Sequence, residues 1–453
     1  MTRLSPAAEP TQLARRDDVA ELTGRRPDAA SLLRLWAAVL LLIPAKLVFA
    51  PLGSAGSPAQ MLGMAGAFWW LTSRVATRLG RSHGFRPVQA AMAAFSFTCL
   101  VSYLIATTRP IEGVELSAAD RGMLVVLSWA GVLLLAGDGI TTRARLDDVL
   151  RVVVAGGAVA ALVGLLQFTT GTSFIDRISI PGLSQNSAVN GVFARNGFSR
   201  AAGTSTHPIE FGVLLTMVLP LALHLALHDP RRGPVRRWFP VVAIGAAIPV
   251  TMSRSALLGL ALVLLIVLPT WPKTRRRWAY TFLIGGFGAV YVAVPGLLGT
   301  MLRLFTGIAG DNSALSRVNS YDIAWHYIGL SPLFGRGFGT FLPRYHILDN
   351  QYLGMAVETG LVGVLAFIGV IATGLVVAFR MYRRVPALAD RSLAISLAGG
   401  LASSTAAAAT FDALGFPQVA GAPFLYLGLV AALSRVRVRT RTAELEELAR
   451  AGG

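Results

Sequence analysis

The sequence predicts an all-α polytopic membrane protein with about twelve transmembrane helices and one large polar loop on the outer face. Three observations support this fold class. Of the 453 residues, 54% are hydrophobic, only 14% are charged, and apolar runs long enough to cross a bilayer recur along the chain. A soluble globular domain carries far more charge, so that class is excluded.

The apolar runs, taken in order, give the expected spans. The seventh and eighth are separated only by Met252, Ser253 and Arg254. Residues 1–31 are polar and should form a disordered cytoplasmic tail, 32–436 the transmembrane domain, and 437–453 a cytoplasmic C-terminal tail. The spans lie near 32–52, 58–74, 87–108, 121–140, 149–168, 208–228, 238–252, 254–271, 279–299, 352–379, 392–411 and 418–435.

Basic residues mark alternate connections between these spans. Arginine-rich loops follow the second, fourth, sixth, eighth, tenth and twelfth spans. Because short cytoplasmic loops retain Lys and Arg, both termini should be cytoplasmic, and the loops at 169–207 and 300–351 should lie outside. The formal charge of +18 then reflects topology and lipid headgroups rather than nucleic-acid binding. Cys99 is the only cysteine, which excludes an intramolecular disulfide.

The basic residues expected on the outer side are not required by topology. A planar guanidinium offers several N–H donors that match phosphate oxygens, so a group of them could hold a lipid pyrophosphate. Arg254 is the strongest candidate because it begins a span at membrane depth. The alternative is ordinary loop arginines paired with Asp311, Asp322 or anionic lipid. The outer set comprises Arg195, Arg200, Arg254, Arg303, Arg317, Arg336 and Arg344.

The large loop should contain a short amphipathic helix from Ser313 to Leu330 that lies along the membrane interface. Arg317 and Tyr321, four residues apart, would share a neighbouring face of it. Pro332 should end the helix, and the glycines after it should form tight turns, since they lack the Lys-Ser/Thr of a phosphate-binding P-loop. The apolar side of the predicted helix carries Leu315, Val318, Trp325 and Ile328.

Candidate acid and base groups follow directly: His346, Asp349, Asn350 and, within the next span, Glu358. A carboxylate or histidine here could take a proton from an acceptor hydroxyl while the arginines stabilise a departing pyrophosphate. Two structural alternatives stay open. Asp349 could instead cap the helix that begins at Tyr352, and Glu358 could make a structural hydrogen bond between helices.

Four blocks of the sequence resemble the O-antigen ligase and polymerase family of bacterial integral-membrane glycosyltransferases. They are RAAGTSTHP at 200–208, SRSALL at 253–258, RVNSYDIAW with PLFG at 317–325 and 332–335, and DNQYL with ETGLVG at 349–353 and 358–363. Together they cover residues 200–363, and the plan of twelve spans extends the resemblance over nearly the whole chain.

The resemblance implies a C-type glycosyltransferase-like enzyme that needs no metal and no other cofactor. It would take a glycan from an undecaprenyl-pyrophosphate donor on the outer face of the bacterial cytoplasmic membrane and pass it to a glycan or lipid acceptor. Arg254 and Arg317 would bind the pyrophosphate. Further substrate contacts would come from Arg200, His207, Arg303, Tyr321, Arg336, Arg344, His346, Asn350, Tyr352 and Glu358.

One position departs from the family pattern. The histidine with which ligases activate the acceptor falls at Asp349, with His346 as a substitute base one turn away. A carboxylate can also act as a base, but the difference favours a polymerase of polysaccharide repeat units over a ligase that transfers a finished glycan to a lipid or cell-wall acceptor.

Two other classes are alternatives. A transporter or flippase of lipid-linked sugars would also have about twelve spans, but transporters place ionisable residues near mid-membrane and often contain internal repeats. No clear repeat is present here, and the candidate residues gather at one outer interface. Cell-wall polymerases of the shape, elongation and division family also have a large outer loop with a key aspartate, but their motifs are not evident.

Overall fold

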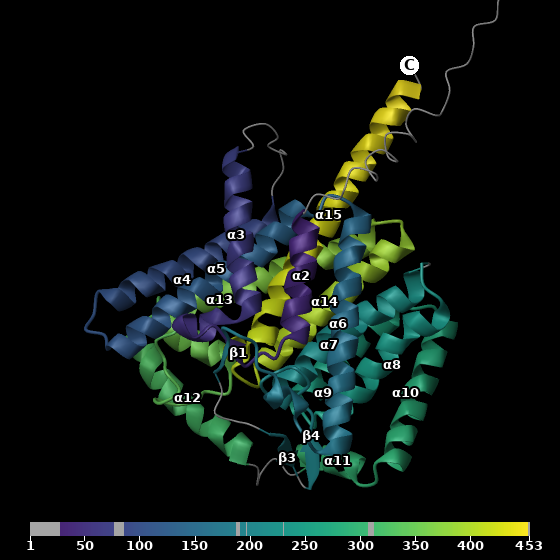
Figure 1. Ribbon diagram of the computed structural model, residues 1–453. Helices are drawn as coiled ribbons and strands as arrows, with labels where there is room; N and C mark the ends of the chain where they lie inside the picture. Colours follow the sequence, from purple (N-terminus) through teal and green to yellow (C-terminus); the bar gives the residue numbers. More distant parts are fainter. Residues whose placement is uncertain are drawn as a thin grey trace, which may run out of the picture.

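The computed structural model describes residues 28–76, 86–186, 191–195, 197–229, 231–306 and 312–451, with the backbone alone at 304–305, 312–319 and 438–451. Helices dominate this part of the chain (Figure 1). They are α2 (Ala29–Leu42), α3 (Pro58–Ala76), α4 (Pro87–Thr107), α5 (Gly113–Gly139), α6 (Arg143–Thr170), α7 (Pro208–His228), α8 (Pro234–Val250), α9 (Arg254–Val267), α10 (Lys273–Ala293), α11 (Leu297–Thr306), α12 (Asn312–Leu330), α13 (Gln351–Arg384), α14 (Leu388–Ala408) and α15 (Pro417–Ala451).

Two short antiparallel ladders accompany the helices in the described ranges. Strand β1 (Leu47–Val48) pairs with β2 (Ser184–Gln185), and β3 (Phe193–Arg195) pairs with β4 (Phe198–Arg200). The short 3-10 helical segments are η1 (Ala50–Gly56), η2 (Phe174–Arg177), η3 (Leu268–Thr270) and η5 (Ala413–Gly415).

Every apolar run predicted to span the membrane overlaps a helix, and the first one does so only in its first half. Within the described ranges, 6 helices are long and apolar enough to cross a bilayer, or 7 when α10 and α11, which meet at a 110° bend, are counted as one span. A mostly helical membrane protein is thus confirmed, whereas the count of twelve crossings and the outer placement of the large loop stay predictions. The 6 are α4, α5, α6, α7, α13 and α15.

The first predicted span, 32–52, is wrong in its second half. Helix α2 ends at Leu42, two residues before Pro44, and the chain continues as strand β1 and turn η1. Lys46 is buried and forms an ion pair with Asp176 in the loop at 169–207. A charged residue with a protein partner stabilises this irregular segment, whereas a helix continuing through lipid would leave the charge unpaired.

Helix α13 is broken inside its apolar run, at Gly360, whose backbone dihedrals are φ 65° and ψ −172°. The glycine-rich segment from Pro332 to Gly337 occupies the break. The N–H of Leu361 donates to the carbonyl of Pro332 (2.9 Å), and that of Gly337 donates to Glu358 (2.9 Å). A break at membrane depth is tolerated when the freed backbone groups find partners in protein. The glycines therefore do more than form the predicted tight turns, because they also let the backbone of the large loop approach the backbone of α13 closely.

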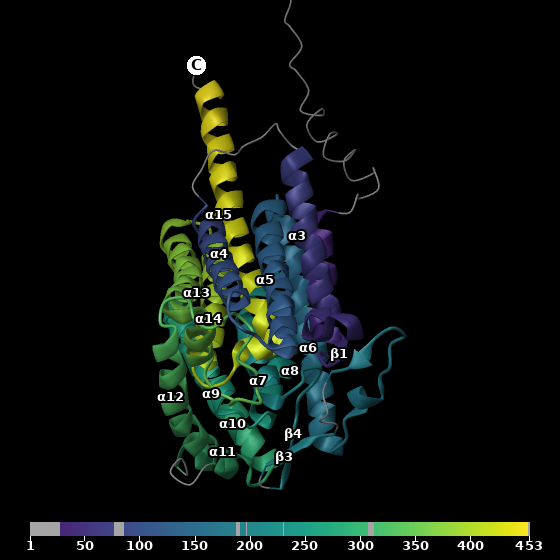
Figure 2. The ribbon, with the colours of Figure 1, turned by 90° about the vertical axis from the view of Figure 1, so that its left-hand side faces the viewer.

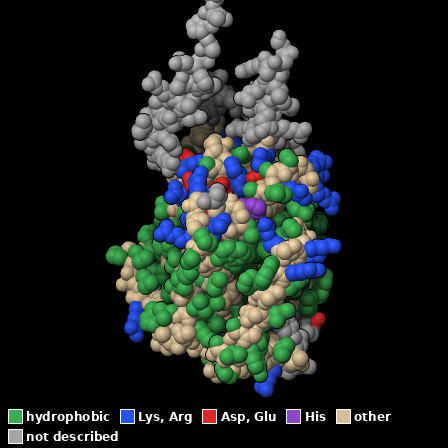
Figure 3. All heavy atoms as spheres, turned by 90° about the vertical axis from the view of Figure 1, so that its right-hand side faces the viewer, with side chains coloured by type: hydrophobic (Ala, Val, Ile, Leu, Met, Phe, Trp, Pro, Cys, Tyr) green, Lys and Arg blue, Asp and Glu red, His purple; other side chains and the backbone are tan. Residues whose placement is uncertain are grey.

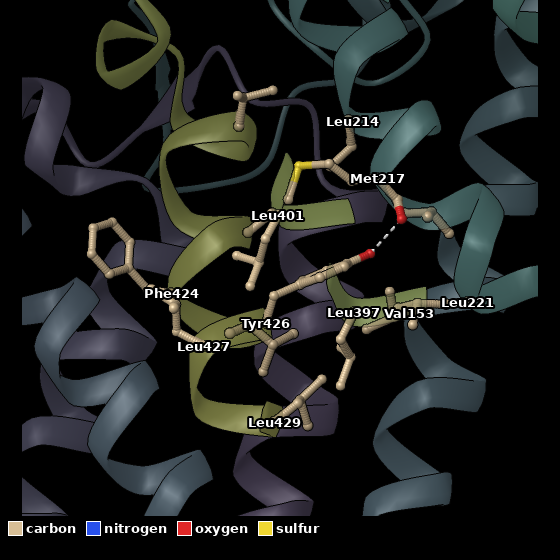
Figure 4. Packing of buried hydrophobic residues seen from close by; sticks show 14 of the residues in the cluster. Val153, Leu214, Met217, Leu221, Leu397, Leu401, Phe424, Tyr426, Leu427 and Leu429 are labelled. Carbon is tan, nitrogen blue, oxygen red and sulfur yellow. Dashed lines mark hydrogen bonds between the residues drawn. The ribbon is translucent and has the colours of Figure 1, made fainter. Parts of the chain in front are cut away.

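Helices α6, α7, α14 and α15 form the centre of the bundle (Figure 4). Tyr426 on α15 points toward α7 and donates its hydroxyl hydrogen to the carbonyl of Met217 (2.8 Å). Gly400 on α14 faces the Tyr426 ring so closely that a Cβ would come within 2.4 Å of it. Small residues allow such close helix packing in membranes, where the lipid offers no hydrophobic drive to associate.

The two ends of the bundle differ. At the end where α15 protrudes (Figure 2), buried Asp390 accepts hydrogen bonds from Arg143 and Arg437, which joins α6, α14 and α15. Lys and Arg side chains gather toward this end, and hydrophobic side chains cover the middle of the face shown in Figure 3. The opposite end carries β3, β4 and α11 (Figure 1). Helix α15 continues to Ala451, so the predicted C-terminal tail at 437–453 is helical over most of its length.

Helix α12 confirms the predicted helix in the large loop, but its faces differ from the expectation. Ala324 and Ile328 are buried against the first half of α13 and against Leu348. Trp325, predicted on the same apolar side as Ile328, is 61% exposed. The reason is rotational: residues one helical turn apart share a face, and the stripe through 320, 324 and 328 is the one that packs. The side chains of Leu315 and Val318 lie outside the described part.

Candidate active site

The segment that leads into α7 is held rigidly by buried polar contacts. Gln167 of α6 accepts hydrogen bonds from the N–H groups of Ala202 (3.1 Å) and Gly203 (2.8 Å), and Gln418 of α15 donates to the carbonyl of Leu40 (2.7 Å) and to the Thr204 hydroxyl (3.2 Å). An irregular segment inside a helical bundle needs such partners for its backbone. The block RAAGTSTHP is thus a fixed platform for Arg200 and His207.

Two arginines on the β3–β4 hairpin bind the connection between α8 and α9. The Nε atom of Arg200 donates to the carbonyl of Thr251 (3.1 Å), and the Nη1 atom of Arg195 donates to the carbonyl of Met252 (3.4 Å). Met252 has φ 45°, which is uncommon for a non-glycine residue. Both guanidinium groups are therefore fixed beside the first residue of α9, Arg254.

Arg200 has an unusual electrostatic environment. Its side chain is only 8% exposed, and no carboxylate pairs with it among the described residues. Burial and the nearby charge of Arg195 lower the pKa of Arg200 to about 10. A buried cation is costly unless an anion compensates it. Arg254, partly exposed at the N-terminus of the 14-residue helix α9, adds both its own charge and the positive end of a helix dipole.

His207 caps α7 and lies between the arginines and the α14–α15 connection. Its Nδ1 atom accepts a hydrogen bond from the N–H of Ile209 (3.1 Å), and its ring contacts Phe193 and Phe416, with centroids 4.6 and 6.0 Å away. Burial, Arg200 and Arg195 lower the pKa of His207 to about 4. His207 is therefore neutral at physiological pH, as an acceptor at a helix N-terminus must be.

Asp349 does not cap α13. Asn350 does so, because its Oδ1 atom accepts hydrogen bonds from the N–H groups of Tyr352 (3.0 Å) and Leu353 (3.4 Å). Asp349 adopts φ 47° and is partly exposed, in the left-handed region that costs free energy for a residue with a side chain. Strained backbone of this kind is frequent at functional sites, so the acid/base hypothesis for Asp349 gains support over the capping alternative.

A second carboxylate, Asp412, lies near Asp349. It belongs to the loop at 409–416 between α14 and α15, where it is exposed. The surrounding protein, together with the negative charge of Asp349, raises the pKa of Asp412 to about 6. Asp412 also interacts electrostatically with Glu358.

The 409–416 loop joins the cationic and the acidic groups. Thr410 hydrogen-bonds through its hydroxyl to Ser255 in the first turn of α9 (2.7 Å). The N–H of Leu414 donates to the side chain of Gln351 in the first turn of α13 (2.7 Å), and Phe416 contacts His207 at the start of α7. One loop thus holds together three helix N-termini, which carry His207, Arg254 and, one residue before the cap, Asp349.

Glu358 and Tyr352 make structural contacts. The Oε1 atom of Glu358 accepts a hydrogen bond from the N–H of Phe341 in the large loop (3.2 Å), and its backbone carbonyl accepts one from Ser102 of α4 (2.7 Å). Tyr352 donates its hydroxyl hydrogen to the carbonyl of Thr405 on α14 (2.8 Å). These contacts agree with the structural alternative for Glu358, which ties the loop to the broken helix.

Arg336 and Arg344 form ion pairs with the beginning of α5, and not with the expected Asp322. Arg336 pairs with buried Glu115 (2.5 Å) and lies over the ring of Tyr345, 4.9 Å from its centroid. Arg344 pairs with Glu112 (2.5 Å), which raises the pKa of Arg344. Both guanidinium groups fix the large loop against α5. Asp311, the other expected partner, lies outside the described residues.

The remaining candidates are spread over α11 and α12. His346 hydrogen-bonds through Nε2 to the hydroxyl of Ser320 (2.9 Å), and the chain from 346 to 350 is not helical, so the expected spacing of one turn to Asp349 is wrong. Tyr321 on α12 is 45% exposed, and Arg303 on α11 is exposed. The helical backbone of α12 includes Arg317, but its side chain lies outside the described part. The roles of all these residues stay predictions.

Comparison with known families decides the class of protein. Residues 239–368 match the family model described as O-antigen ligase. This chain carries an O-antigen ligase family domain. The match runs from α8 into α13 and includes Arg254 and Asp349, whereas Arg200 and Asp412 lie outside it. The resemblance indicated by the motifs is confirmed over this part of the chain, and the match supports an O-antigen ligase-type membrane glycosyltransferase. No curated protein matches the chain.

Asp412 was absent from the residues predicted for this site, and Arg195 was predicted only as one of the outer arginines, without a link to Arg200. The pair Asn-Gly at 196–197 is the strongest short-range sequence signal for a hairpin, and it would have placed Arg195 beside Arg200. Asp412 is the one carboxylate in the short connection between the last two apolar runs. Nothing in its local pattern indicates that it lies near Asp349, because that proximity depends on the packing of α13 against α14.

Proposed function

We propose that this protein transfers a glycan from an undecaprenyl-pyrophosphate donor to an acceptor hydroxyl at the outer face of the bacterial cytoplasmic membrane, polymerising polysaccharide repeat units. Both termini would lie in the cytoplasm. The observation that carries the proposal is the environment of Arg200, a buried cation with a carbonyl but no carboxylate as partner in the described structure, beside Arg195. An anionic group of a bound substrate would compensate that charge.

The reaction would begin when Asp349 takes the proton of the acceptor hydroxyl. The acceptor oxygen forms a bond to the anomeric carbon of the donor sugar, and the bond from that carbon to the diphosphate oxygen breaks. The diphosphate leaves with the electron pair, and Arg254, Arg317 and Arg200 bind the charge that develops on it. Asp349 then returns its proton to solvent.

Repeat-unit polymerisation is favoured over ligation to a lipid or cell-wall acceptor by the carboxylate at position 349. The test is deletion of the gene in the native host and complementation with wild type or Asp349→Asn, followed by separation of lipid-linked and surface glycans by size. A polymerase predicts loss of long chains and accumulation of single lipid-linked repeats. Long lipid-linked chains without transfer would identify a ligase instead.

Metal independence belongs to the same proposal. The arginines supply the positive charge that a divalent cation provides in other glycosyl transfers. Activity of the purified protein should therefore persist in EDTA. Inhibition by EDTA that added Mg²⁺ reverses would contradict this part of the mechanism.

A transporter or flippase of lipid-linked sugars is the second candidate, and the interrupted helix α13 is the observation that favours it. Against it, the segment from Pro332 to Gly337 fills that break, so the freed backbone groups are not offered to a ligand. A transporter mutant would accumulate its lipid-linked glycan on the inner leaflet. The enzyme proposal predicts accumulation on the outer leaflet, where added glycosidase can reach it in intact spheroplasts.

A further inference from the structure

We propose that Gln351 is a positioning residue of the candidate active site, because its side chain holds the loop of Asp412 at a fixed distance from Asp349. The loop is the 409–416 connection between α14 and α15. This inference rests on the proposed function, since it concerns the base of the proposed reaction. It assigns Gln351 no contact with substrate.

The side chain of Gln351 supplies an acceptor that the loop itself lacks. Leu414 belongs to the short 3-10 segment η5, and the first N–H groups of such a segment have no backbone acceptor within it. The N–H of Leu414 donates instead to the Oε1 atom of Gln351 (2.7 Å), and Gln351 is only 4% exposed. An amide that loses its partner inside the protein costs free energy, so this hydrogen bond resists opening.

Asp412 lies midway between two attachments of the loop. Thr410, two residues before it, hydrogen-bonds to Ser255 of α9 (2.7 Å). Leu414, two residues after it, is bound to Gln351 of α13. The attachment at Leu414 therefore holds Asp412 toward α13, whereas the one at Thr410 holds it toward α9.

The direction of the Asp412 carboxylate is fixed by the same turn. Asp412 precedes η5, and a Cβ on Gly415 would lie 2.6 Å from its Oδ2 atom, so the carboxylate is folded back over the turn. On the α13 side, Asn350 caps the helix, and Asp349 precedes that cap with φ 47°. Each carboxylate is thus two residues away from one end of the connecting hydrogen bond, which joins two locally fixed segments.

The separation matters because each carboxylate acts on the proton affinity of the other. The surrounding protein and the negative charge of Asp349 raise the pKa of Asp412 to about 6. Coulomb repulsion weakens with distance, so an ionised Asp412 makes Asp349 a stronger base only while the two stay close. If the loop moved away from α13, Asp349 would be less able to take the proton of the acceptor hydroxyl.

The test compares the initial rate of glycan transfer as a function of pH. Purified full-length protein in lipid nanodiscs is given lipid-linked repeat units isolated from the deletion strain. Gln351→Met keeps the volume of the side chain but removes the acceptor, so its rise in rate should move about half a pH unit toward lower pH, with a lower plateau. Gln351→Asn, whose amide is too short to reach Leu414, should shift the rise the same way and serves if Gln351→Met melts too low to be assayed.

A double variant separates positioning from general destabilisation. In the Asp412→Asn background, Gln351→Met should cause no further shift, because the residue through which it acts is already neutral. Ser255→Ala cuts the opposite attachment of the loop and is the matched control, so its rate should rise at the same pH as that of wild type. Other ionisable groups on the elements in contact with the loop are the same in all these variants: His207, Glu210, Arg254 and Glu358.

A Gln351→Met profile that superimposes on that of wild type would overturn the inference, while the proposed function stands. An equal shift in the Asp412→Asn background would also overturn it, because Gln351 would then act by another route. If Asp349→Asn keeps the full rate, the proposed function itself fails, and the role of Gln351 falls with it.

Discussion

Gly360 of α13 and Leu333 of the large loop lie so close that a Cβ atom on the glycine would come within 2.3 Å of the Leu333 carbonyl carbon and oxygen. Gly360 also adopts backbone dihedrals that are essentially restricted to glycine. We expect Gly360→Ala to cost at least ~3 kcal/mol and to lower the melting temperature of the purified protein sharply. Gly369→Ala, in the same helix with open space around the Cβ position, is the control and should melt like wild type.

The Asp349 and Asp412 pair predicts a pH dependence of activity. The pKa of Asp412 is raised to about 6, so its carboxyl is protonated at pH 5 and ionised at pH 7.5. An ionised Asp412 strengthens Asp349 as a base because the neighbouring negative charge favours the protonated form of Asp349. Initial rates should rise between pH 5 and 7, and Asp412→Asn should move that rise to lower pH and reduce its plateau. Identical profiles for the two proteins would exclude the coupling.

Loss of the base itself should have a larger effect than loss of its neighbour. Asp349→Asn keeps the size of the side chain but cannot accept the proton, so turnover should fall by at least ~10²-fold with membrane insertion unchanged. The measurement is glycan transfer in membranes matched for protein content. An unchanged rate would move the base to His346 or Glu358.

The ion pair of Arg336 with Glu115 predicts a loss of stability. Glu115 is buried, and Arg336→Met would leave its carboxylate with Arg109 (3.5 Å) and the Tyr345 hydroxyl (2.6 Å) but without its closest cation, which should lower the melting temperature. Adding Glu115→Gln to Arg336→Met should restore part of the lost melting temperature, since the poorly compensated charge is then removed. Activity loss without any change in melting temperature would instead support a substrate-binding role for Arg336.

His207 predicts a separate acid sensitivity of stability. Its pKa is lowered to about 4 in the folded protein, below its usual value of 6.5, so the unfolded chain binds the proton more readily. The stability contributed by neutral His207 is complete above about pH 6.5 and is lost as pH falls toward 4, amounting to about 2 kcal/mol at pH 5. His207→Asn keeps a capping side chain and should lose less melting temperature between pH 7.5 and 5 than wild type does.

The arginines should act on catalysis rather than on folding. Arg254→Ala and Arg317→Ala should each abolish glycan transfer, because the departing diphosphate would lose a charge-assisted partner. Protein amount and monodispersity in detergent provide the control for insertion and folding. Full activity in both variants would remove the proposed pyrophosphate contact.

The sequence was sufficient to predict the helices, because apolar runs in a bilayer must pair their backbone groups internally and so become helical. It also located the change from α8 to α9 at Met252, Ser253 and Arg254. The prediction failed where a distant segment stabilises irregular backbone. The chain just after α2 is one example, because Lys46 there forms an ion pair with Asp176 of a later loop. Hydropathy carries no information about such pairs.

For the candidate site, local patterns identified the residues that begin helices but not their partners. Arg254 and Asp349 stand beside apolar runs and could be recognised from that position alone. The engagement of Arg336 by Glu115 joins residues more than two hundred positions apart, and the proximity of Asp412 to Asp349 depends on how three helices pack. Neither of these two relations produces a periodic pattern in the sequence from which it could be predicted.

Helix α10 has no buried residue along its whole length, although it joins the central bundle to α11. We expect lipid acyl chains to cover most of this helix, so that its tilt responds to the thickness of the bilayer. The turn after α10 contains Gly296, which meets Phe198 of the hairpin. The detergent or lipid used in purification should therefore affect the position of the β3–β4 hairpin, which carries Arg195 and Arg200, through the tilt of α10. In short-chain detergents the hairpin should become disordered before the helical bundle unfolds.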